Sequence, residues 1–105
     1  MRVLIDACLP VELKTLLEGT EVKTARDMGW QRLDNGQLLN KADGRFDVLV
    51  TMDKAMPSQQ ILARYSIALV IIKAQSNRID DLNSLLPAIQ AGINRGARGT
   101  ATLAP

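Results

Sequence analysis

The chain has 105 residues, of which 47% are hydrophobic and only 3% aromatic, and its formal net charge is +2. This length predicts a single domain over residues 1–105, and the apolar content excludes a disordered chain. The lack of histidine excludes Ser-His and Cys-His catalysis, and the single cysteine, Cys8, excludes an internal disulfide. No apolar run is long enough to cross a membrane and no secretory signal is recognisable, so we expect a cytoplasmic protein with no membrane partner.

Short apolar runs and helical patterns alternate along the chain. Strands are predicted at residues 2–6, 21–24, 46–51 and 67–72, with a short edge strand at 100–103 as an optional fifth. Helices are predicted at residues 9–17, 34–42, 57–65 and, as one long helix, 76–93, followed by a flexible turn at 94–99. Parallel strands covered by helices on both faces appear as continuous Val, Ile and Leu runs. The fold class is therefore α/β, a three-layer sandwich around a mainly parallel four-stranded sheet.

Four aspartates follow predicted strands or begin helices. Asp6 and Asp53 each come after an apolar strand, Asp27 follows the second strand, and Asp34 begins the second helix. Ligands of open α/β sheets bind beyond the carboxyl ends of the strands, so these acids are candidate ligands of one cation. Ligands that are all oxygen favour Mg²⁺ or Mn²⁺ and, with them, phosphodiester hydrolysis. The alternative for Asp27 is an ordinary turn residue, and for Asp34 a helix N-cap.

Basic residues are predicted near the same edge of the sheet. They are Arg26, Arg32, Arg45 and Lys54. These side chains either guide a phosphate to the acids or form a solvated rim.

A series of short segments resembles the small bacterial PIN-like proteins of unassigned function, which are related to the PIN-domain ribonucleases of toxin–antitoxin pairs. The segments are the first aspartate with Leu9-Pro10, Met28-Gly29-Trp30, Asn35-Gly36-Gln37-Leu38-Leu39, the run from Phe46 to Asp53, and Ser76-Asn77-Arg78. Their order covers the chain up to about Pro87. The resemblance implies a PIN-like fold, Mg²⁺ or Mn²⁺ as cofactor, single-stranded RNA as substrate and an antitoxin protein as partner.

The resemblance also implies roles for individual residues. Asp6 and Asp53 match acids of the PIN site, and Asp27 matches a third more loosely. Together with Asp34 they form the predicted metal site, in which Asp6, Asp53 and Asp34 are the candidate catalytic residues.

The chain departs from the PIN-like pattern at several positions where relatives often carry an acid. Ala7, Asn35, Gln37 and Ala55 stand there. Each departure removes negative charge that a divalent cation needs, so a non-catalytic PIN-like binding module is an alternative to a nuclease.

A second alternative is a phosphoacceptor receiver domain, because the strand ending at Asp53 and the following Met56-Pro57 resemble that family. Receivers usually have two adjacent acids after the first strand, whereas here Ala7 follows Asp6, and they need a lysine after a fifth strand. We also expect self-association, because Leu85, Leu86 and Ile89 of the last helix exceed what a small sheet covers.

Overall fold

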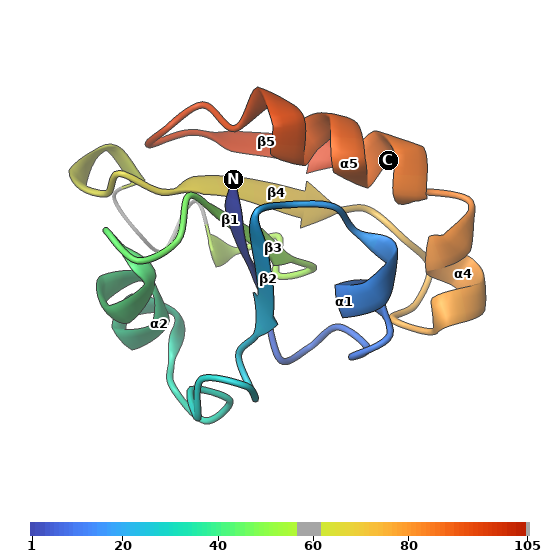
Figure 1. Ribbon diagram of the computed structural model, residues 1–105, viewed down its shortest axis with the longest axis horizontal. Helices are drawn as coiled ribbons and strands as arrows, with labels where there is room; N and C mark the ends of the chain where they lie inside the picture. The colour runs from blue at the N-terminus through green and yellow to red at the C-terminus, as the bar shows by residue number, and fades with distance from the viewer. Residues whose placement is uncertain (57–61, 105) are drawn as a thin grey trace.

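The computed structural model describes residues 1–56 and 62–104 as one sheet with helices on both faces (Figure 1). The strands are β1 (Arg2–Ile5), β2 (Glu21–Thr24), β3 (Val48–Thr51), β4 (Ala68–Ile72) and β5 (Ala101–Ala104). All neighbouring strands are parallel, in the order β2-β1-β3-β4-β5. The predicted α/β class is confirmed, and the C-terminal strand is a full fifth member of the sheet.

Each face of the sheet carries its own apolar core. Val3, Val50 and Val70 point to the face covered by α1 (Leu13–Leu16), α4 (Ile79–Asn83) and α5 (Leu86–Arg95). Leu4 and Leu49 point to the other face, covered by α2 (Asn35–Ala42). β3 and β4 are buried along their whole length, which explains why their sequences show no polar alternation.

The first helix is much shorter than predicted. The leucine spacing predicted a helix over residues 9–17, but α1 is one turn that ends when Leu17 becomes extended. The chain must return at once to begin β2, and Thr20 already donates its N–H to the Met1 carbonyl. Leu16, the last residue of α1, is 43% exposed.

The long C-terminal helix is in fact two helices. α4 ends at Asn83 and α5 begins at Leu86, so Ser84 and Leu85 form the break. Pro87 lies in the first turn of α5, where its missing N–H needs no partner, but it could not continue α4 without removing a hydrogen bond. α5 also extends to Arg95, so the predicted turn at 94–99 begins only at Gly96.

The apolar stripe of this region is largely covered. Leu82, Ile89 and Ile93 are buried and Leu85 and Leu86 are half-buried. The expectation that Ile89 lies outside the core is therefore wrong, and self-association remains a prediction without that support.

Two further expectations concern the remaining segments. The helix predicted at residues 57–65 falls partly outside the described residues, and its described part contains the 3-10 turn η1 (Leu62–Arg64). No helix within the described ranges is both long and apolar enough to span a membrane.

Candidate functional site

The sheet reverses its winding between β1 and β3. After β1 the chain moves outward to β2, and it then crosses back to place β3 on the other side of β1. In doubly wound sheets the crevice at such a switch point, beyond the carboxyl ends of the strands, is the usual ligand site. Asp6 directly follows β1 and Asp53 lies two residues after β3, and the adjacent pairing of Ile5 with Val50 brings both acids to this crevice.

Thr51 links the two acidic segments. Its hydroxyl donates to the Asp6 carboxylate, with 2.7 Å between Thr51 Oγ1 and Asp6 Oδ2, and it accepts the Asp53 backbone N–H at 3.0 Å. Thr51 is completely buried, so this hydroxyl fixes the geometry of both acids from within the sheet. The sequence analysis did not predict this role for Thr51. The signal for it is a hydroxyl residue in an otherwise aliphatic strand.

The second oxygen of Asp6 is held locally, since Oδ1 accepts the Ala7 N–H at 2.8 Å. Asp53 is held by a local and a distant donor. Its Oδ1 accepts the Ala55 N–H at 2.9 Å, and its Oδ2 accepts the side-chain amide of Asn35 at 2.7 Å. Asn35 is the first residue of α2, so the start of this helix joins the ends of β1 and β3.

Asp34 lies elsewhere although it is the neighbour of Asn35. Its carboxylate accepts the Gln37 N–H at 2.8 Å, and the Gln37 side chain accepts the Asp34 N–H at 3.2 Å. This reciprocal pair is a capping box that begins α2. The alternative interpretation of Asp34 as an N-cap is confirmed, and its predicted place in the acid cluster is wrong because its carboxylate is committed to the helix end.

Asp27 also has a local structural task. Its carboxylate accepts the Thr24 N–H at 2.9 Å and forms an ion pair with Lys14, with 2.9 Å between Lys14 Nζ and Asp27 Oδ2. The Thr24 N–H and the Lys14 ammonium both lower the pKa of Asp27. Asp27 thus joins the turn after β2 to α1 rather than the pair Asp6 and Asp53.

Within the described residues, no three His, Cys, Asp or Glu side chains are arranged to hold a metal ion. The predicted four-acid cluster is therefore reduced to Asp6 and Asp53. Two carboxylates still suit Mg²⁺ or Mn²⁺, because Mg²⁺ in proteins is often held by one or two carboxylates together with water and substrate phosphates. A carboxylate has about four acceptor positions, and the four hydrogen bonds above use about half of the total on the two acids. The donor set fits an open, weak site for a divalent cation.

Two further polar groups border this pair. Cys8 Sγ lies 3.8 Å from Thr51 Oγ1, and the Asn77 side chain donates to the Cys8 carbonyl at 3.0 Å. Loss of water around the sulfur raises the pKa of the Cys8 thiol, and the nearby charge of Asp6 raises it further. The thiol therefore stays protonated near neutral pH and is a poor nucleophile.

The basic residues lie at opposite ends of the parallel strands. Arg26 and Lys54 follow β2 and β3 and are exposed at the edge that carries Asp6 and Asp53. Arg45 precedes β3 and its guanidinium lies 3.9 Å from Glu21, at the start of β2. The expectation that Arg45 lies near the acids is therefore wrong, because Arg45 lies at the amino ends of the strands and the acids lie at the carboxyl ends.

Compared with models of known protein families, with curated proteins and with solved structures, the chain has no match. The site at the ends of β1 and β3 has to be interpreted from its own geometry.

Proposed function

We propose that the chain is a PIN-like protein that cleaves single-stranded RNA with Mg²⁺ or Mn²⁺ bound at Asp6 and Asp53. The observation that carries this proposal is the placement of both carboxylates at the switch point between β1 and β3, joined by the buried hydroxyl of Thr51. When bound there, the cation would supply polarisation of a phosphoryl oxygen and activation of water.

Two residues of the chain would hold the cation, and two others position the side chains of those ligands. Asp6 and Asp53 hold the cation, while Thr51 fixes the side chain of Asp6 and Asn35 fixes that of Asp53. Asn35 and Thr51 are therefore positioning residues. Exposed Arg26 and Lys54 at the same edge supply positive charge that attracts the phosphate backbone of RNA.

The experiment compares RNA cleavage by the parent chain and two variants. A labelled single-stranded RNA is incubated with Mn²⁺ and with parent protein, Asp53→Asn or Asp34→Asn. Asp53→Asn removes one of two cation ligands, and we expect cleavage to fall by at least a hundredfold. Asp34→Asn removes a neighbouring carboxylate but keeps a good N-cap, so we expect it to cleave like the parent. Equal cleavage by the Asp53→Asn variant would refute the assignment.

A non-catalytic binding module is the second candidate, and one observation favours it. Every carboxylate oxygen of Asp6 and Asp53 already accepts a hydrogen bond from the chain, and Asn35 stands where relatives often carry an acid. Such a site is stable without a cation. RNA or antitoxin binding by the parent without any metal-dependent cleavage would establish this candidate.

A receiver domain would have the same fold, but the chain lacks the lysine and the second acid that receivers usually carry. The strand order 2-1-3-4-5 is also that of flavodoxin-like proteins, which include receivers, so topology does not separate the two. β5 contains no lysine, and Asp6 is followed by Ala7. Formation of an acid-labile phosphate on Asp53 with a small phosphodonor would favour the receiver over the nuclease.

A further inference from the structure

The two outer strands of the sheet differ in how their free edges are protected. β2 carries the charged residues Glu21 and Lys23, and the Asp27 carboxylate accepts the Thr24 N–H at the end of the strand at 2.9 Å. β5 contains no charged residue. Proteins usually protect a free strand edge with charges or a cover, so an edge without such protection is a place where another strand can pair.

The backbone of β5 presents hydrogen-bond groups to the outside of the sheet. The carbonyls of Thr100 and Ala104 accept N–H groups of β4 and of the residue after it, at 2.9 and 3.0 Å. Backbone groups alternate between the two sides of a strand, so the even-numbered residues face β4 and the groups of Ala101 and Leu103 face away. In the part of the chain that the structure describes, β5 is the last strand of the sheet, and these outward N–H and C=O groups have no strand beside them.

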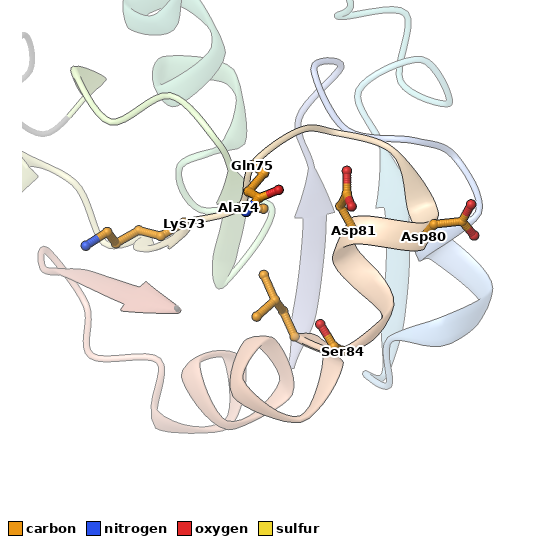
Figure 2. Close-up of a pocket in the computed structure, with 7 residues that line it drawn as sticks. Lys73, Ala74, Gln75, Asp80, Asp81 and Ser84 are labelled. Carbon is orange, nitrogen blue, oxygen red and sulfur yellow. The ribbon is translucent and has the colours of Figure 1, made fainter.

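Charged side chains lie beyond the ends of this edge rather than along it. Arg98, before β5, lines a hollow of about 220 Å³ together with Arg2 and so lies toward the inner strands. At the other end Lys73 follows β4, and Figure 2 shows Asp80 and Asp81 farther from β5, across a hollow of about 350 Å³. A second uncharged strand can therefore approach β5 without facing a like charge.

We propose that β5 pairs antiparallel with β5 of a second copy of the chain, about a two-fold axis at Thr102. In this register Ala101 lies opposite Leu103 of the second copy, and the two such pairs exchange about four backbone hydrogen bonds. The axis is perpendicular to the sheet, so the same face of both copies points the same way. Leu103, which is 54% exposed, then packs across Ala101 and diagonally to Leu103 of the second copy. The proposal is independent of the nuclease activity proposed above.

The same axis brings α5 of the two copies together on one face of the joined sheet. α5 lies over the groove between β4 and β5, because a Cβ atom at Gly92 would lie 3.1 Å from Val70 Cγ1 and 3.9 Å from Thr102 Cγ2. Neighbouring strands are about 4.8 Å apart, so the axes of the two helices would be separated by about 10 Å, near the spacing of packed helices. The interface therefore contains a helix contact in addition to the strand pair.

Small residues occupy the side of α5 that would meet its copy. The Gln90 side chain donates to the Glu18 carbonyl, just before β2, and this contact marks the side of α5 that faces the middle of the sheet. At about 100° per residue, Ala88 lies about 160° from Gln90 and so faces the free edge, next to Gly92. Arg95 lies on the same side near the end of α5, where the antiparallel arrangement keeps the two copies of this charge apart.

Sedimentation velocity of the full chain over a range of concentrations tests the association. An interface of one short strand and one helix belongs to the small, transient class, so we expect a dissociation constant on the order of 10–100 µM. Leu103→Lys puts like charges diagonally across the axis, and we expect it to raise this constant by at least about tenfold. Val11→Lys is the matched control, because Val11 is a comparable apolar residue, 51% exposed and remote from β5, and we expect it to associate like the parent.

Amide hydrogen exchange followed by NMR identifies the surface. The amides of Ala101 and Leu103 should exchange more slowly as the protein concentration rises, whereas the Thr102 amide, which faces β4, should be protected at every concentration. A monomer at all concentrations overturns the proposal, as does a dimer that Leu103→Lys leaves intact. Exchange at Ala101 and Leu103 that slows only on addition of an unrelated extended peptide would assign the edge to another protein and overturn the second copy as its occupant.

Discussion

The substitution Asn35→Asp tests the proposed cation site most directly. It replaces the 2.7 Å hydrogen bond between Asn35 Nδ2 and Asp53 Oδ2 with two facing carboxylates. At a separation of about 4 Å their repulsion is about 1 kcal/mol in water and about 4 kcal/mol at an effective dielectric of about 20. Residue 35 is the first residue of α2, where the helix dipole stabilises the added negative charge by about 0.5 kcal/mol. Both side chains are half-buried, so we expect the metal-free variant to be about 2 kcal/mol less stable than the parent.

A divalent cation should reverse this loss. The third carboxylate raises the affinity of the site, and a cation at a hundred times its dissociation constant stabilises the folded state by about 2.7 kcal/mol. The melting temperature is measured with and without Mn²⁺ for the parent, for Asn35→Asp and for Gln37→Glu. The last variant adds the same charge to the same helical turn, but its side chain faces Asp34 rather than Asp53. We expect a large Mn²⁺ shift only in Asn35→Asp, and equal shifts in all three proteins would refute the cation site.

Two further predictions concern the hydrogen bonds around the sheet. Thr51→Val removes the hydroxyl that serves Asp6, and urea unfolding should show a loss of about 1–3 kcal/mol, whereas Thr102→Val on the edge strand should change stability by less than about 0.5 kcal/mol. Asp47 accepts the side-chain N–H groups and the backbone N–H of Arg2, which lower its pKa. Its contribution is therefore complete above the unfolded pKa of about 4 and is lost as the pH falls through the lower folded value. The stability difference between the parent and Asp47→Asn should be present at pH 7 and shrink at pH 3. A constant difference would contradict this linkage.

The strands were predictable because burial on both faces leaves a strong mark on sequence. β2 has the predicted bounds, and β1, β3 and β4 differ from prediction by one or two residues at an end. Continuous runs of Val, Ile and Leu are typical of strands in the interior of a helix-covered parallel sheet.

The helix lengths were not predictable from apolar spacing alone. Leu9, Leu13 and Leu17 are all buried, but only Leu13 lies in a helix. Turns can place apolar side chains at the same intervals as a helix, so periodicity locates the buried residues without fixing the backbone between them. Pro87 in the middle of the predicted long helix was a usable signal for the break before α5.

The acids of the site illustrate a similar limit. Strand ends were predicted well enough to place Asp6 and Asp53 together, because parallel neighbours end at the same edge. At the start of α2, however, a shift of one residue decides which side chain caps the helix and which faces the sheet. Asp34 caps it and Asn35 faces Asp53, which sequence reasoning could not resolve since helix boundaries are uncertain by more than one residue.

The hydrogen bonds of Asp53 also explain how one site can suit either candidate function. The Ala55 N–H is a backbone donor and fixes one oxygen of Asp53 whatever is bound. The Asn35 donor is a side-chain amide, and rotation of that amide by half a turn replaces its N–H₂ with a carbonyl oxygen at the same place. In the first orientation the amide stabilises the Asp53 carboxylate by a hydrogen bond without a cation, as a binding module requires. In the second it adds a third oxygen to the two carboxylates, as Mg²⁺ prefers. A cation at Asp53 Oδ2 would compete with the amide nitrogen for the same carboxylate oxygen, so we expect cation binding to favour the second orientation.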